Sequence, residues 1–313
     1  MANNLSNIKR TAYEAFYQRL GSAVSNYSQI GDDIVVTTDT HTLQVYNTFG
    51  VTHFAAQTGG SDPAAEDVLS AKNTVASATY EKLVRVTEQD AMDNPELVPE
   101  LARQMADAGS SSIANTFWTT VAGLHNLDHP NTFKVDASNG ANKYIDPDHN
   151  KIRVGSDDKA SLTQTNKLTA ALSSSSLNSA KGLLQAYKND GGIPINPDMS
   201  NDNLCLVVPA ALAATGRDLV ELSTPFFKSD LSESVGTFGG MGLVVAPYLD
   251  SADTNNWWLF HKRYSPVRIW IRKAPTLRIE TQQATGHISI YASGTWASVV
   301  MPHEMGVVGS IVA

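Results

Sequence analysis

Apolar positions along the chain follow two spacings, and each spacing predicts a different kind of element. Near the N-terminus, apolar residues recur every three or four positions, at Ile8, Ala12, Ala15, Phe16 and Leu20. This period predicts one amphipathic helix within residues 1–30. Residues 34–80 are rich in β-branched and aromatic residues around the turn-rich segment QTGGSDPAAED, which predicts a long β-hairpin with a polar tip. A two-stranded hairpin cannot bury both faces alone, so we expect it to need a partner.

A strand pattern changes into a helix pattern within the segment YEKLVRVTEQDAMDNPELVPELARQMADAG, residues 80–109. Asp93 or Asn94 fits a helix cap, with Pro95 at the first helical position. Pro99 would interrupt that helix, because an internal proline removes a hydrogen bond. We therefore expect one preliminary turn and then a regular helix over residues 99–122, about 36 Å long at 1.5 Å per residue.

The remaining pattern mixes helices and strands and contains no internal repeat. Residues 125–160 are polar and predict loops, and residues 161–189 predict a second helical region that ends at NDGG. The segments NLCLVVP and FGGMGLVVAPYL predict strands, and AALAATGRDLVEL between them predicts a short helix. Residues 257–313 are rich in strand patterns; VRIWIRK alternates apolar and polar residues, as a half-buried strand does. The predicted fold class is α+β.

Composition narrows the class of protein. The 313 residues carry a net charge of −8, which argues against nucleic-acid binding through one broad basic surface. Cys205 is the only cysteine, so a disulfide within the chain and a zinc site built on cysteines are excluded. The first residues lack the apolar core of a signal peptide, and no apolar run is long enough to span a membrane. We expect a soluble intracellular product with no membrane partner.

Charge is unevenly placed along the chain. Residues 81–107 carry seven acids against three bases, whereas residues 257–283 carry six bases against one acid. The basic strands could pack against residues 81–107, which we call the acidic join, within one subunit or between subunits. Alternatively, both segments are solvated faces that contribute little to stability. The sequence leaves these readings open.

Motifs for catalysis are weak throughout. The sequence contains no nucleophile elbow and no phosphate-binding loop, since FGGMG lacks the required lysine. His125 and His129 have the spacing of metal ligands on a helix, but Pro130 follows at once and ends any helix there. Trp257 and Trp258 favour a buried core or interface anchor over a platform for stacking bases. We expect no catalytic residue, no cofactor and no metal site, and therefore not an enzyme.

Three groups of segments carry a resemblance to a known family. They are the strand-to-helix join at residues 80–109, the helix and strand at residues 183–212, and the closing strands at residues 257–281 and 294–302. Their order resembles that of the major capsid proteins of tailed phages with the Hong Kong 97-type fold. The likeness is closest to the Mu-like major head subunit group.

The resemblance implies a domain organisation. Its parts are an N-terminal arm (1–30), an extended loop formed by the hairpin (31–79), a peripheral domain with a long spine helix (80–123 and 247–313), and an axial domain (124–246). The arm would reach over a neighbouring subunit, and the extended loop would lie across an adjacent one.

The resemblance also implies which residues meet other subunits. On the extended loop these are Leu43, Val45, Tyr46, Phe49, Phe54, Gly59, Gly60 and Pro63. On the arm they are Lys9, Arg10, Phe16 and Arg19. The charged contacts, within or between subunits, would join Glu88, Asp90 and Asp93 to Arg268 and Arg272.

The implied function is that of a major capsid protein. Such a protein assembles with itself into hexamers and pentamers of an icosahedral shell, meets a portal and other head proteins, and contacts packaged double-stranded DNA weakly. It would be assembled in the host cytoplasm and located in the virion. Two alternatives remain: an encapsulin-like compartment shell, and a soluble α+β enzyme with an unrecognised site.

Overall fold

The computed structural model describes most of two packed units and part of the hairpin. The described residues are 2–22, 27–30, 32–35, 42–49, 69–123, 143–146, 151–154, 167–186, 198–220, 239–251, 254–282, 286–300 and 306–310. Most of the predicted loop region at 125–160 therefore lies outside them. Two short antiparallel strands are described within it, β5 (Lys143–Asp146) and β6 (Lys151–Val154).

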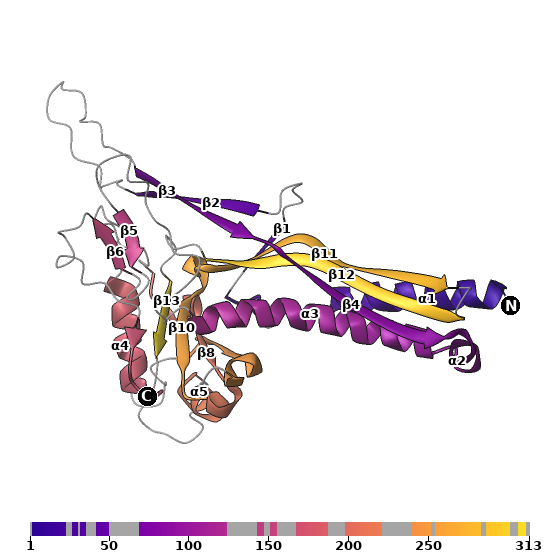
Figure 1. The fold of residues 1–313 in the computed structure, drawn as a ribbon. Helices are drawn as coiled ribbons and strands as arrows, with labels where there is room; N and C mark the ends of the chain where they lie inside the picture. The colour runs from indigo at the N-terminus through magenta and orange to yellow at the C-terminus, as the bar shows by residue number, and fades with distance from the viewer. Residues whose placement is uncertain are drawn as a thin grey trace, which may run out of the picture.

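A long four-stranded sheet forms one unit (Figure 1). Its order is β1 (Asp32–Val35), β11 (Val267–Gln282), β12 (His287–Val300) and β4 (Ala78–Thr87). β1 runs parallel to β11, and the other pairs are antiparallel. Gly286 lies in the turn between β11 and β12 with a φ of +63°, a conformation that suits a residue without Cβ.

One face of this sheet is apolar and covered by helices. Alternate residues of β11 and β12 are buried there: Leu277, Ile279, Ile288 and Ile290. This is the period of two that a half-covered strand requires. At the start of β11 the predicted half-buried pattern fails at Trp270, which is fully buried although it alternates with Val267 and Ile269. Both faces of the sheet are covered at that end.

Three helices pack along the apolar face. α2 (Glu88–Asp93) is the preliminary turn that the sequence predicted, and α3 (Leu97–Gly123) is the long helix, about 40 Å at 1.5 Å per residue. α3 begins two residues before Pro99, because a proline in the first turn breaks no helical hydrogen bond. α1 (Ala2–Ser22) lies beside α3 (Figure 1).

A five-stranded sheet forms the second unit. Its order is β7 (Lys167–Leu168), β13 (Val307–Ser310), β10 (Trp257–His261), β8 (Leu204–Val208) and β9 (Gly242–Val245). Every residue of the three central strands is buried. The helices α4 (Ser174–Ala186) and α5 (Ala213–Val220) pack against this sheet (Figure 1).

The helix α4 is shorter than predicted and begins in a run of serines. The amide of Ser176 donates to Oγ of Ser173, and the amide of Ser173 donates to Oγ of Ser176. This reciprocal pair satisfies two amides at the helix start, as a capping box does. The serine run is therefore the start of a helix.

The two units share one core at the end of α3. Phe117 and Trp118 of α3 pack there with Trp258 of the five-stranded sheet and Ile269 of the four-stranded sheet. Trp257, the neighbour of Trp258, faces a second core between the five-stranded sheet and α4. Both tryptophans are fully buried and serve as core anchors.

Candidate assembly surfaces

The hairpin strands form a sheet of their own, separate from the two larger sheets. β2 (Thr42–Phe49) and β3 (Leu69–Ala76) pair antiparallel along their whole length, with Leu43 opposite Val75 and Tyr46 opposite Lys72. β3 leads directly into β4, and the ribbon of β2 and β3 diverges from the long sheet (Figure 1). An isolated two-stranded sheet is marginally stable in water, so this arrangement calls for a covering surface.

Only part of the predicted extended-loop contact set can be placed. Leu43 is half-buried in its own chain, and Val45, Tyr46 and Phe49 lie on β2. The tip residues lie outside the described residues: Phe54, Gly59, Gly60 and Pro63. The contacts of the extended loop remain a prediction.

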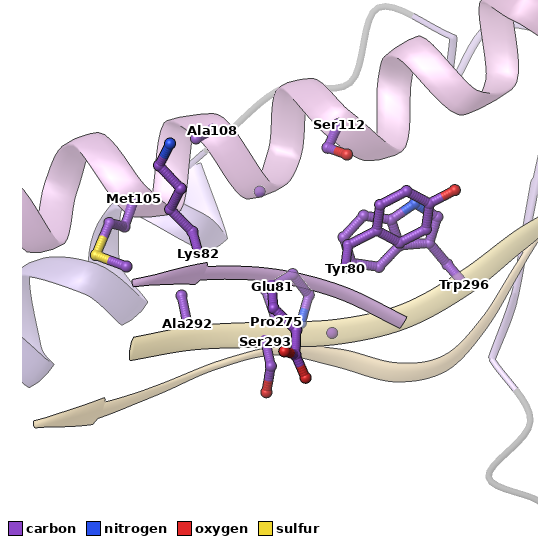
Figure 2. Close-up of a pocket in the computed structure, with 12 residues that line it drawn as sticks. Tyr80, Glu81, Lys82, Met105, Ala108, Ser112, Pro275, Ala292, Ser293 and Trp296 are labelled. Carbon is purple, nitrogen blue, oxygen red and sulfur yellow. The ribbon is translucent and has the colours of Figure 1, made fainter. Parts of the chain in front are cut away.

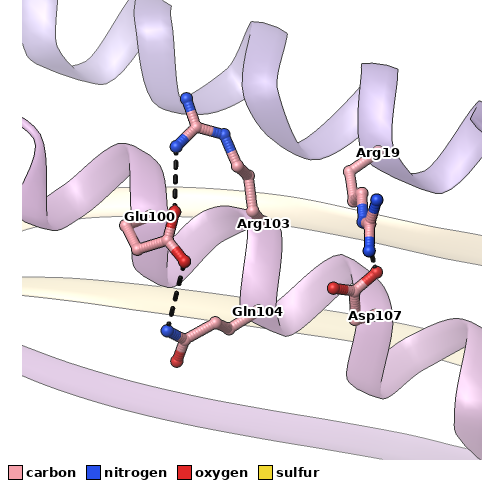
Figure 3. Close-up of polar contacts among 5 residues, drawn as sticks. All are labelled: Arg19, Glu100, Arg103, Gln104 and Asp107. Atoms are coloured by element: carbon pink, nitrogen blue, oxygen red, sulfur yellow. Dashed lines mark hydrogen bonds and ion pairs between the residues drawn. The ribbon is translucent and has the colours of Figure 1, made fainter.

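The N-terminal helix packs on its own subunit, which corrects part of the predicted arm. Phe16 is fully buried in the core between α1, α3 and the sheet, so its side chain has no surface left for a neighbour. Arg19 donates from Nε to Oδ1 of Asp107 on α3 at 2.6 Å (Figure 3). The apolar stripe of α1 thus meets α3 of the same chain. Arg10 is exposed, and Lys9 is partly buried beside the core stripe of α1.

A second polar group lies on the surface of α3 next to α1 (Figure 3). Nη1 of Arg103 donates to Oε2 of Glu100 at 2.9 Å, and Nε2 of Gln104 donates to Oε1 of the same carboxylate at 3.4 Å. The hydrogen bond from Arg103, joined by that from Gln104, lowers the pKa of Glu100. These side chains are solvent-exposed, so their ion pair adds little stability.

The helix α2, which follows β4, is capped by Thr87, a residue that was not among the predicted caps. Oγ1 of Thr87 accepts from the amide of Asp90 at 3.1 Å and donates to Oδ2 of Asp90 at 2.6 Å. Thr87 is therefore the N-cap of α2, and Asp93 ends that helix instead of capping the next one. The spacing of Thr87 and Asp90 matches a capping box and was a usable signal.

The acidic join does not meet the predicted arginines within one subunit. Glu88, Asp90 and Asp93 follow β4, whose end pairs through β12 with the end of β11 near Gln282. Arg272 lies ten residues earlier on β11, about 30 Å away at 3.3 Å per residue. Arg268 is farther still, and its Nη1 donates to the carbonyl of Ser265. The intrasubunit contact was wrong, and only a contact between subunits stays a prediction.

A pocket of about 250 Å³ opens between α3 and the sheet, where β11 bulges around Pro275 (Figure 2). Tyr80 and Trp296 stack at one end, with ring centroids 4.3 Å apart and planes 8° apart. Nε1 of Trp296 donates to Oγ1 of Thr116, which holds the indole in place. Lys82 extends from β4 towards α3 at the other end. This largely apolar lining suits an apolar group.

Buried polar groups in the five-stranded unit have structural roles. Nε2 of His261 lies 2.7 Å from the carbonyl oxygen of Asp198. A carbonyl can only accept, so Nε2 carries the proton, and Nδ1 is a buried acceptor without a hydrogen-bond partner among the described residues. Burial lowers the pKa of His261 and raises that of the Cys205 thiol to about 12. A thiol with so high a pKa is a poor nucleophile.

Among the described residues, no three His, Cys, Asp or Glu side chains gather where they could bind an ion. His125 and His129 lie outside that part of the chain. No helix that the structure describes combines the length and apolarity needed to cross a bilayer.

Sequence comparison gives no relative: no family model matches the chain, and no curated protein matches it. Solved structures do match. The mature capsid of bacteriophage PhiM1 is similar with a TM-score of 0.59 at 11% identity, over 93% of this chain and 88% of that one. The capsid of a native GTA particle gives 0.54 at 13% identity, over 93% and 91%.

A further match is a virus-like particle from Pyrococcus furiosus, with a TM-score of 0.51 at 11% identity, over 96% of this chain and 98% of that one. At these identities the likeness concerns the fold alone. The matches run nearly end to end and include both units. The predicted fold is confirmed: the chain has the α+β, Hong Kong 97-like fold of phage capsid proteins.

Proposed function

We propose that this chain is a major capsid protein that assembles with itself into hexamers and pentamers of an icosahedral shell enclosing phage DNA. The observation that carries the proposal is the end-to-end likeness to capsid subunits such as that of PhiM1, in which both packed units take part. A fold alone does not fix a function. The proposal therefore also rests on what the surfaces of this subunit require.

The hairpin gives that physical support. β2 and β3 form a two-stranded sheet of their own, outside both larger sheets. Laid across an adjacent copy, this ribbon would gain a covering surface. A shell repeats such a contact many times, so modest contacts add up to a stable assembly.

The domain assignment follows from the same proposal. We assign the four-stranded sheet with α3 to the peripheral domain and its spine helix, and the five-stranded unit to the axial domain around the centre of a capsomer. This assignment differs from the predicted bounds at β10 and β13, which fall in the predicted peripheral segment 247–313 but pair within the five-stranded sheet. α1 belongs with the peripheral domain, since it packs on α3. The Mu-like group remains the proposed subgroup.

Partners other than the chain itself are proposed from charge and from the assembly. A net charge of −8 disfavours tight binding to DNA, so contact with packaged double-stranded DNA would be weak and non-specific. Lys9 and Arg10 of α1 are the cations proposed for that contact, because neither side chain is fully buried in the core. A portal and other head proteins are the further partners, and the virion is the proposed location.

Electron microscopy and size-exclusion chromatography of the expressed chain test the function. Hexamers, or closed or tubular shells, are the expected result. A 34 kDa monomer under all conditions, including with the other head proteins present, would contradict the proposal. A compartment shell is the runner-up and would be identified by protein cargo in place of nucleic acid inside the particles.

A further inference from the structure

The long sheet has a second face that points away from the helices. Strand residues alternate between faces, and the buried set on β11 and β12 packs under α1, α2 and α3. The intervening residues therefore point to the opposite side, which we call the outer face. They are Leu83 and Arg85 on β4, Arg278 and Glu280 on β11, and Ser289 and Tyr291 on β12.

The outer face contains a shallow groove of about 200 Å³, and those six residues line it together with Gln282. Register explains the groove. Ser289 of the central strand lies directly between Glu280 and Arg85 of the flanking strands. A small side chain between two long ones leaves a depression along β12.

Two polar groups in the groove lack partners, although their neighbours are paired. Nη2 of Arg278 lies 2.5 Å from Oε1 of Glu280, and the hydroxyl of Tyr291 hydrogen-bonds to Glu81. Arg85, by contrast, has no hydrogen-bond or ion-pair partner among the described residues. Oγ of Ser289 is also unpartnered, and this residue is only 7% exposed.

A buried hydroxyl without a partner is uncommon in folded proteins and calls for an explanation. An unpaired guanidinium beside it makes the pair a receptor for a carboxylate, which accepts hydrogen bonds from both. Leu83, 49% exposed, is one of two large hydrophobic side chains that are exposed in the described part of the chain. Arginine, tyrosine and an exposed leucine together are typical of a protein contact surface.

Carboxylates without partners lie at the same end of the molecule. Asp93 and Glu96, between α2 and α3, are exposed, and their side chains have no partner among the described residues. They cannot reach the groove of their own chain. Ala91 and Val98, which flank them, are buried on the helix side of the sheet, so the sheet separates the two surfaces.

We propose that the outer-face groove at Arg85 and Ser289 binds the Asp93–Glu96 corner of a second copy of this chain. This contact deepens the proposed self-assembly and rests on it. The groove and the corner are different surfaces, so the contact is head-to-tail and generates a ring when the rotation closes. The second copy is the occupant because its corner offers the carboxylates that the groove requires.

Crosslinking tests the contact directly. In assembled Arg85→Lys protein, a carbodiimide would join the introduced lysine to the peptide containing Asp93 and Glu96. Mixed ¹⁵N-labelled and unlabelled chains would identify the link as intermolecular by mass spectrometry. The matched control is Arg217→Lys, the same exchange at an exposed arginine on α5, which should give no such link.

Charge reversal tests whether the contact supports assembly. The Arg85→Glu/Arg278→Glu variant and the Asp93→Lys/Glu96→Lys variant should each raise the concentration needed for assembly about tenfold, through repulsion at the contact. Combining all four changes in one chain should bring the concentration needed for assembly back to within about threefold of the parent value, because the charges are then complementary again. Arg217→Glu controls for net charge, and thermal unfolding checks that each variant is folded.

The outcomes separate this contact from the proposed function. Particles that form equally well from every variant, without the crosslink, would overturn the contact and leave the shell function intact. A chain that forms no particles would contradict the shell function, and absence of the crosslink in that chain would overturn the contact as well. The crosslink together with rescue by the combined variant supports the contact.

Discussion

Of two glycines that line the pocket between α3 and the sheet, one has no room for a Cβ and the other does. A Cβ on Gly294 would lie 2.6 Å from Cζ3 of Trp296 and 3.2 Å from the Pro275 backbone. A Cβ on Gly109, in the middle of α3, would meet only the Pro275 ring at 3.5 Å, an ordinary contact. Only Gly294 is therefore required by close approach, whereas Gly109 lowers helix propensity and leaves space open.

We expect Gly109→Ala to raise the free energy of unfolding by about 1 kcal/mol, because alanine is the better helix former. Gly294→Ala should lower it by about 1–3 kcal/mol, because Trp296 and the bulge must move. Urea unfolding of the two variants measures both. A destabilised Gly109→Ala protein would mean that α3 requires this glycine for another reason.

His261 should make stability depend on pH in the weakly acidic range. Burial lowers the pKa of His261 below its ordinary 6.5 in the folded state. The unfolded chain therefore binds a proton as pH falls through about 6.5, while the folded chain does not. Stability contributed by the neutral imidazole is present above that pH and is lost as pH falls towards the folded pKa.

The measurement is the free energy of unfolding at pH 7.5 and at pH 5.5 for the parent chain and for His261→Gln. Glutamine keeps an N–H for the carbonyl of Asp198 but does not titrate in this range. The loss of stability between the two pH values should be smaller in the variant. An equal loss in both proteins would assign the pH dependence to other groups.

At the scale of elements, sequence periodicity predicted which helices and strands exist better than it predicted what each of them packs against. The amphipathic pattern of α1 was visible in the sequence, but whether its apolar stripe meets its own α3 or a neighbour depends on packing that no local pattern encodes. The hydroxyl of Tyr13 on α1 also accepts from the amide of Ile279, at an edge of β11 that β1 does not cover. α1 thus covers a strand edge with which a strand of another chain could otherwise pair.

The hairpin gives the element-scale prediction. Replacing residues 57–67 by a short Gly-Ser turn should leave the subunit folded, because both larger sheets and their cores lie elsewhere in the chain. Shell assembly should be lost, since the shortened ribbon cannot cross a neighbouring copy. Circular dichroism checks the fold, and electron microscopy counts the shells. Normal shells from this variant would refute the role of the tip.

At the scale of the molecule, the order of elements was predictable because each segment carries its own period. The pairing was not. β1 joins β11 in parallel across more than 230 residues of sequence, and β13 lies between β7 and β10. Such long-range pairs depend on the complete core. The candidate surfaces could not be predicted from the sequence for the same reason. Arg85 and Ser289 carry no sequence motif and become neighbours only through strand register.

The shared core at the end of α3 should make the two units unfold together. Phe117 is fully buried there and stacks on Tyr27 with ring centroids 4.6 Å apart, among residues from both sheets. Phe117→Ala should cost about 3–5 kcal/mol, the range for removing a buried aromatic ring. Because the cavity lies between the units, helix content and tryptophan fluorescence should shift to lower urea together.

Leu184→Ala is the matched control, since Leu184 is equally buried but lies in the core between α4 and the five-stranded sheet. If the junction couples the units, this variant should also show one transition for both probes. Two separated transitions in Phe117→Ala would contradict the expected joint shift. Two transitions in the parent chain would contradict a shared core and make each unit an independent folding domain.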